Sequence, residues 1–207
     1  MFQLAKLVPD KTVFFLCDMQ IRFKTAIYGF DEVVLTINKM LRVAKVLDIP
    51  VMVTEQNPKG LGNTAPEIDL ASLGDLHVAT IEKSLFSMMV PEIKALLQER
   101  PHVKSVVLFG IESHVCVLQS ALDLLQEGYD VHVLADGVSS CNREEVPIAL
   151  ARIRQAGGCI TTSESAAFQL QREAGTPRFK AFSAVIKEEK ENTARTAREL
   201  LQHRSSL

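Results

Sequence analysis

The sequence predicts an α/β fold: a three-layer αβα sandwich built on a six-stranded, mainly parallel, doubly wound sheet. Two observations lead to this fold class. Six short segments rich in β-branched residues alternate with helix-like segments along the 207-residue chain, and such alternation indicates βαβ units. Several of the six are continuous apolar runs, which are typical of strands covered on both faces. Right-handed crossovers then place helices on both sides of the sheet.

The strands are expected where short apolar segments are bounded by polar or turn-forming residues. These segments are 12–19, 50–56, 77–83, 105–111, 130–136 and 158–164. Helices are expected between them, at 31–48, 90–100, 113–128 and 142–158.

Each helix carries a periodic stripe or a boundary signal. In the first, Val34, Ile37 and Leu41 share one face. Pro91 lies near the start of the second, where a missing N–H costs little, and Gly128 ends the third as a C′ residue. For the fourth, we predict Asn142 as the N-cap. Gly157 and Gly158 end it, and Pro147 either kinks it or belongs to its first turn.

Two segments fall outside this pattern. Residues 57–76 are rich in Gly, Pro and Asn, and so long a loop in a compact domain is usually functional or mobile. Residues 187–207 are strongly charged. We therefore expect one domain over 1–186 and a charged C-terminal tail over 187–207, with a solvated helix favoured over an interaction arm.

Composition argues against several classes of partner. Hydrophobic residues make up 47% of the chain and charged residues 23%, which is typical of a globular protein. The formal net charge of −2 argues against broad binding to nucleic acid or to an anionic membrane. The apolar runs are too short to span a bilayer, and residues 1–11 do not resemble a signal peptide. We therefore expect a cytoplasmic protein in a reducing compartment, without structural disulfides.

Common cofactor motifs are missing from the sequence. It contains no G-x-G-x-x-G, no Walker A sequence and no G-x-S-x-G elbow. The five histidines do not pair as H-x-H or H-E-x-x-H, and no cysteine pair has zinc-finger spacing. The sequence therefore predicts neither a cofactor nor a metal centre.

Three reactive side chains fall at expected strand ends, where sites gather in open α/β sheets. Asp18 follows the first strand, Lys83 ends the third, and Cys116 follows the fourth in the first turn of a helix. A thiol reacts as its thiolate, which the positive end of a helix stabilises. A carboxylate can accept the thiol proton, and a lysine can keep that carboxylate ionised.

Residue pattern alone leaves other roles open. A single cysteine on an amphipathic helix is more often a packing residue. An aspartate after a strand is often a turn residue, and a lysine there is usually solvated. We interpret Cys17, Cys141 and Cys159 as structural.

Five ordered motifs over about residues 11–170 resemble the isochorismatase-like, or cysteine hydrolase, superfamily, and most of all its eukaryotic isochorismatase domain-containing proteins. The resemblance rests on 18–20 (D-M-Q), 82–87 (E-K-S-L-F-S), 110–117 (G-I-E-S-H-V-C-V), 120–131 and 136–140. It implies a catalytic triad of Asp18, Lys83 and Cys116. It also implies a cis peptide bond at Ile111–Glu112 that helps to form an oxyanion hole.

The same resemblance implies a small-molecule substrate, no cofactor and a homo-oligomer. The substrate pocket would be formed by Gln20, Phe23, Gln56, Phe86, Ser87 and His114, with a cap or surface role for His114 left open. The region after the second strand lacks the D-x-H metal site of nicotinamidases. Some relatives in parasites carry the name ribonuclease, which the composition does not support.

Three functions follow as hypotheses. The first is a cysteine hydrolase that cleaves a small amide-like substrate through a thioester on Cys116; family members that cleave a vinyl ether often have glycine at that position. The second is an isochorismatase-type vinyl-ether hydrolase that uses Asp18 as the acid. The third is a non-catalytic binding or scaffold protein that retains the site.

Overall fold

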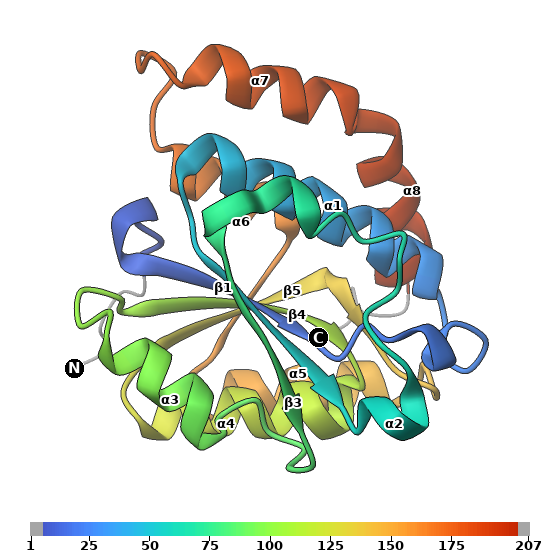
Figure 1. The fold of residues 1–207 in the computed structure, drawn as a ribbon. Helices are drawn as coiled ribbons and strands as arrows, with labels where there is room; N and C mark the ends of the chain where they lie inside the picture. Colours follow the sequence, from blue (N-terminus) through green and yellow to red (C-terminus); the bar gives the residue numbers. More distant parts are fainter. Residues whose placement is uncertain (1–5, 203–207) are drawn as a thin grey trace.

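A computed structural model describes residues 6–202 of the chain. The start of the predicted domain, residues 1–5, and the end of the predicted tail, residues 203–207, lie outside this range. The described residues form a three-layer αβα sandwich (Figure 1). Its six-stranded sheet has the order β3-β2-β1-β4-β5-β6, and every neighbouring pair is parallel. The predicted fold class is confirmed.

The strands are short and mostly buried. They are β1 (Thr12–Cys17), β2 (Val51–Gln56), β3 (His77–Lys83), β4 (Ser105–Ile111), β5 (Asp130–Ser139) and β6 (Cys159–Thr161). The longer helices are α1 (Phe30–Leu47), α3 (Pro91–Gln98), α4 (Leu118–Gln126), α5 (Glu145–Gln155), α6 (Ser163–Gln171), α7 (Phe179–Glu188) and α8 (Lys190–Leu201). Short turns are η1 (Pro9–Lys11), η2 (Ile21–Phe23), α2 (Pro58–Leu61), η3 (Ala71–Leu76) and η4 (Ser113–Val117).

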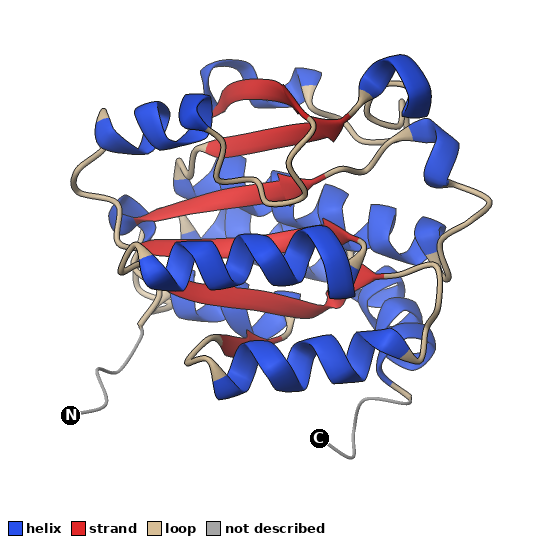
Figure 2. Ribbon diagram, turned by 90° about the horizontal axis from the view of Figure 1, so that it is seen from below, coloured by secondary structure: helices blue, strands red, loops and turns tan. Residues whose placement is uncertain are grey.

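The two faces of the sheet support separate apolar cores. Alternate residues of one strand point to opposite faces, so Phe14 and Leu16 of β1 pack with α1, α6, α7 and α8. Phe15 and Cys17 pack on the other face, with α3, α4 and α5. Figure 2 shows helices in front of and behind the strands. Burial on both faces explains why the central strands, such as β1 and β4, are continuous apolar runs.

Element boundaries differ from prediction mainly near the fifth and sixth strands. Asn142 is not the N-cap, because α5 begins at Glu145 after a turn closed by the Glu145 N–H and the Asn142 carbonyl. Pro147 therefore lies in the first turn and does not kink the helix. β6 ends at Thr161, since the Thr162 hydroxyl oxygen caps α6 by accepting a hydrogen bond from the Ser165 N–H.

The charged C-terminal segment packs on the domain as far as residue 202. Its predicted start at residue 187 falls inside α7, and α8 then lies along α1 (Figure 1). Leu200 is buried in the core on that face, and the Arg195 guanidinium donates to the Glu32 carboxylate. The described part of this segment is thus a packed helix and not a projecting arm.

Candidate active site

The order of the strands reverses direction between β1 and β4. Successive connections run outward from β1 through β2 to β3, and then from β4 through β5 to β6. In doubly wound sheets this switch point opens a crevice at the carboxyl ends of the strands. Asp18 follows β1, Lys83 ends β3, and η4, which contains Cys116, follows β4. All three predicted triad residues therefore lie at one end of the sheet.

Asp18 and Lys83 form a buried ion pair. The Lys83 Nζ lies 2.7 Å from the Asp18 Oδ2, and both side chains are almost entirely removed from solvent. The other carboxylate oxygen, Oδ1, accepts a hydrogen bond of 2.8 Å from the Thr54 hydroxyl. A buried carboxylate needs such partners to offset the cost of its burial, and these contacts fix its direction.

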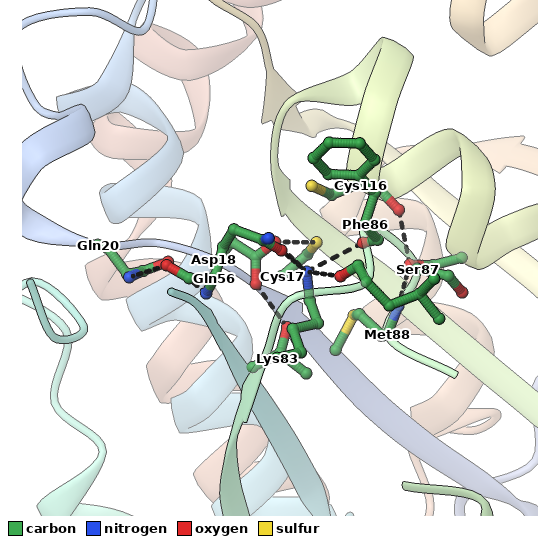
Figure 3. Close-up of polar contacts among 12 residues, drawn as sticks. Cys17, Asp18, Gln20, Gln56, Lys83, Phe86, Ser87, Met88 and Cys116 are labelled. Carbon is green, nitrogen blue, oxygen red and sulfur yellow. Dashed lines mark hydrogen bonds and ion pairs between the residues drawn. The ribbon is translucent and has the colours of Figure 1, made fainter. Parts of the chain in front are cut away.

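Lys83 also holds the segment that follows β3. Its Nζ lies 2.7 Å from the Gln56 Oε1, 3.1 Å from the Leu85 carbonyl oxygen and 2.9 Å from the Phe86 carbonyl oxygen. Figure 3 shows these contacts converging on the ammonium group. All its close partners are oxygen acceptors, so these charge-assisted hydrogen bonds fix the position of the ammonium group.

Gln20 supports this arrangement from the β1 side. Its Nε2 donates to the carbonyl oxygens of Gln56, at 2.9 Å, and Gly62, at 2.6 Å, and its Oε1 accepts from the Gln56 N–H at 2.7 Å. The fully buried Gln20 therefore positions Gln56, which in turn contacts Lys83. Its predicted place in the substrate pocket stays a prediction.

Cys116 lies in η4, a single π-helical turn that leads into α4. Its side chain is only 5% exposed. The Ser120 hydroxyl donates to the Cys116 carbonyl oxygen at 2.6 Å and accepts from the Met88 N–H at 2.8 Å. Ser120 thus links the cysteine turn to the segment after β3. Isolated π turns are frequent at functional sites.

Cys17 connects the carboxylate to this turn. Its thiol donates to the Asp18 Oδ2 at 3.6 Å. Burial, a side-chain hydrogen bond with Cys116 and the charge of Asp18 raise the pKa of Cys17 well above its usual value. Cys17 is therefore a neutral thiol between Asp18 and Cys116 (Figure 3), and its predicted burial is confirmed.

The predicted cis bond at Ile111–Glu112 is wrong. The peptide bonds of the described residues are trans, and Glu112 has φ 59° and ψ 64°, in the left-handed region. The chain therefore turns from β4 into η4 through a positive φ. The Glu112 carbonyl oxygen accepts from the N–H groups of Val115, at 3.0 Å, and Val117, at 3.2 Å.

Gly110 allows β4 to pass close to β1 at the site. It has φ +135°, and a Cβ at this position would lie 2.2 Å from the Cys17 carbonyl oxygen. A side chain would thus collide with the backbone next to Asp18. Glycine is required here by both conformation and space.

A cleft of about 590 Å³ opens beside the ion pair. Its lining includes Lys83 and two of the predicted pocket residues, Gln56 and Phe86, and the loop after β2 contributes Asn57, Pro58 and Lys59. The other predicted pocket residues do not line it. Gln20 and Ser87 are buried, Phe23 packs against the core on the α1 side, and His114 pairs with Glu112 and Ser140.

A larger cavity, of about 850 Å³, lies at the opposite end of the sheet. It is lined by residues that precede β1 and β2 and by residues at the end of α6 and after it, and it contains none of the predicted site residues. Its position at the amino ends of the strands argues against a role in the chemistry at their carboxyl ends.

Sequence reasoning missed Thr54 and Ser120, whose hydroxyls bind the Asp18 carboxylate and the Cys116 carbonyl. It also did not group Glu112, His114 and Cys141, whose side chains converge. Thr54 and Ser120 lie in an ordinary strand and helix, and Cys141 comes from a different segment from Glu112 and His114, which are two residues apart. The alternation within β2 could have placed Thr54 toward one face, but no spacing rule joins Cys141 to His114.

Comparison with known proteins relates the whole domain to one family. The family model described as "Isochorismatase domain" matches residues 12–165. Isochorismatase domain-containing protein 2 of Xenopus laevis is 45% identical over 186 residues, or 90% of this chain and 88% of that protein. Isochorismatase domain-containing protein 1 of Salmo salar is 46% identical over 89% of this chain, which spans 64% of that longer relative.

A solved structure from Caenorhabditis elegans has the same fold. It is described as a MAR1 ribonuclease, is 37% identical, and superposes with a TM-score of 0.80 over 88% of this chain and 93% of its own. The family model covers most of the chain and the relatives align over about nine tenths of it. The chain belongs to the isochorismatase-like family of hydrolases.

Proposed function

We propose that this hydrolase cleaves a small amide-like substrate, such as an amide or a ureido compound, through a thioester on Cys116. One observation carries the proposal. The buried Asp18 carboxylate, paired with Lys83, lies against the Cys17 thiol, which itself contacts Cys116. A thiol nucleophile, a carboxylate that can act as its base and a cation beside that carboxylate are together suited to acyl transfer to a cysteine.

In the first half of the reaction, Asp18 accepts the Cys116 proton, and the thiolate attacks the carbonyl carbon. The developing oxyanion is stabilised by N–H groups at the start of η4, including those of Glu112 and Cys116. Such donors supply about 3–4 kcal/mol. As the C–N bond breaks, Asp18 returns the proton to the nitrogen, so that an amine leaves and a thioester remains.

In the second half, water enters where the amine left. Asp18 removes a proton from the water as it attacks the thioester carbon. The C–S bond then breaks, the proton passes to the Cys116 sulfur, and a carboxylic acid leaves. Lys83 keeps Asp18 ionised between the two halves. No metal is needed to balance either step.

The cleft beside Lys83 supports a small substrate. Its volume of about 590 Å³ falls within the usual range of small-molecule sites. Phe86 provides an apolar wall that is half exposed, and Gln56 and Lys59 supply polar groups. Since Asn57, Pro58 and Lys59 come from the long loop after β2, we infer that this loop selects the substrate.

The proposal is tested by intact-mass measurement after mixing the protein with a panel of small amides, ureido compounds and trapping aldehydes. We expect a covalent adduct on the wild type and on the control Cys159→Ser, and none on Cys116→Ala. Turnover of the matching amide should be lost together with the adduct. Amide turnover that persists in Cys116→Ala would contradict the thioester mechanism.

Two other outcomes identify the alternative functions. Hydrolysis of a vinyl ether that survives in Cys116→Ala but is lost in Asp18→Asn would indicate the isochorismatase-type reaction. The binding or scaffold role would be indicated if the wild type turned over none of the panel. In that case the wild type and Cys116→Ala should also bind the same protein partner equally well.

Three expectations about the chain's surroundings stay predictions. Half-exposed apolar side chains at Ile21, Leu85 and Phe86 support a homo-oligomer, which light scattering of the purified protein would test. Cytoplasmic localisation and the lack of nucleic-acid binding rest on composition. Among residues 6–202, no helix is both long and apolar enough to cross a membrane.

A further inference from the structure

Three side chains with metal-binding chemistry converge beside the cysteine turn. Glu112 lies between β4 and η4, His114 lies in η4, and Cys141 lies in the loop after β5. A carboxylate oxygen, a ring nitrogen and a sulfur from these residues lie within 4.8 Å of one another. Oxygen, nitrogen and sulfur donors together are a ligand set of Zn²⁺.

Two of the three separations between these ligand atoms are close to those of a tetrahedral zinc site. The His114 Nδ1 lies 3.4 Å from the Glu112 Oε2, and the Cys141 Sγ lies 3.7 Å from that same oxygen. With zinc–ligand bonds of about 2.0–2.3 Å, neighbouring ligand atoms are roughly 3.3–3.6 Å apart. The first separation lies within this range, the second exceeds it by about a tenth of an ångström, and the third pair of ligand atoms lies within 4.8 Å.

The fold holds the three residues together. Ile111 of β4 pairs with Ser139 of β5, so the residues that follow these two strands emerge side by side. The Ser113 hydroxyl donates to the Ser139 carbonyl oxygen at 3.0 Å. The His114 Nδ1 lies 3.1 Å from the Ser140 Oγ, a contact that it would exchange for the ion on binding. The left-handed backbone of Glu112 completes the turn that brings its side chain to Cys141.

Solvent can reach this cluster. The side chains of His114 and Glu112 are 26% and 16% exposed, and Cys141 is exposed. A hydrated ion can therefore enter without unfolding the chain. Three protein ligands leave one position of a tetrahedron open to water or to an added ligand.

We propose that Glu112, His114 and Cys141 form a binding site for a divalent cation of the zinc class. On binding, the thiol of Cys141 gives its proton to solvent, and its sulfur coordinates the ion as a thiolate. The ion joins the loop after β5 to the turn that contains Cys116. This site is separate from the Asp18–Lys83 pair, and it does not depend on the proposed amide chemistry.

Titration with Co²⁺, which reports thiolate coordination through a charge-transfer absorption band, tests the proposal. We expect the wild type to develop this band at one equivalent and to lose it when Zn²⁺ is added. Cys141→Ser should lack the band. Cys159→Ser and Cys116→Ser should keep it, which separates this site from binding at the other accessible thiol and from binding at the proposed nucleophile.

Two further measurements address the remaining ligands. His114→Gln and Glu112→Gln should each weaken Co²⁺ binding by more than about tenfold. Zn²⁺ should slow the alkylation of Cys141 but not the alkylation of Cys159, with both rates measured by peptide mass mapping. A band that persists in Cys141→Ser, or its absence from the folded wild type, would overturn the proposal.

Discussion

The Lys83 ammonium lies 2.7 Å from the Asp18 carboxylate, and neither side chain is appreciably exposed. The pair connects the carboxyl ends of β1 and β3 although β2 lies between them. Gln56, at the end of β2, completes the bridge through its contact with Lys83. The pair therefore fixes the geometry of three strand ends, and both its structural and its proposed chemical role can be measured.

Loss of one partner should leave an uncompensated buried charge. We expect Lys83→Met to lower the free energy of unfolding by about 3–5 kcal/mol, measured by urea denaturation. The double variant Asp18→Asn/Lys83→Met should recover part of this loss, because it removes both charges. Neither variant should hydrolyse the amide substrate.

The surface pair Lys94–Glu127 is a matched control, since its two charged atoms also lie 2.7 Å apart but both side chains are nearly half exposed. Lys94→Met should change the free energy of unfolding by less than about 1 kcal/mol. Equal losses in Lys83→Met and Lys94→Met would show that burial does not decide the contribution of the Asp18 pair.

Gly110→Ala should destabilise the fold strongly. The new Cβ would lie 2.2 Å from the Cys17 carbonyl oxygen, at a φ that non-glycine residues rarely adopt. Overpacking and backbone strain together predict a loss of at least about 3 kcal/mol. Thermal and urea unfolding measure it. Gly175→Ala is the control, because a Cβ at that position would have no atom within 4 Å, and its stability should stay near that of the wild type.

Much of this architecture could be predicted from the sequence because burial on both faces leaves a local signal. The apolar run of 105–111 matches β4 to the residue, and the predicted segment 77–83 matches β3, an edge strand whose side chains are mostly half-buried. Gly128 follows α4 with φ +86°, as expected of a C′ residue. Asp18, Lys83 and Cys116 could be placed at one end of the sheet because parallel strands all end on the same side.

Other features depend on tertiary contacts and leave no local signal. The sequence pattern does not predict α6 and α7. Polar residues are interspersed in α7 and dominate α8, so the pattern does not show that Phe182 and Leu200 pack in the same core as α1. The backbone conformation of Glu112 depends on how β4 meets η4, which the sequence does not specify locally. The resemblance to a family therefore predicts a cis bond, whereas the structure has a left-handed residue there. Phe23 and Ser87 cannot be assigned to core or pocket from their positions in the sequence.

Leu200 tests whether α8 is part of the folded unit. Its side chain is 2% exposed and reaches α1 near Gly29. Leu200→Ala should therefore lower the free energy of unfolding by about 2–5 kcal/mol, measured by urea denaturation. Leu201→Ala, one residue further and only partly buried, should cost less. Wild-type stability in Leu200→Ala would mean that α8 does not pack on the domain in solution.

His132 should make stability depend on pH. This residue of β5 is fully buried, and neither ring nitrogen has a hydrogen-bond partner among the described residues. Burial lowers the pKa of His132 below its usual value of 6.5, although the charge of Asp130 opposes the shift. As pH falls through about 6.5, the unfolded chain takes up a proton before the folded chain does. The free energy of unfolding should therefore decrease with falling pH until the folded-state pKa is reached.

The contribution of this histidine is isolated by comparing urea unfolding between pH 8 and pH 5 in three proteins. His132→Gln should have a shallower decrease than the wild type over this range, because no imidazole remains to be protonated on unfolding. His102→Gln, which alters an exposed side chain, should keep the wild-type slope. If His132→Gln and the wild type lose stability in parallel, then protonation of His132 is not what destabilises the folded state in mild acid, and other groups must account for the decrease.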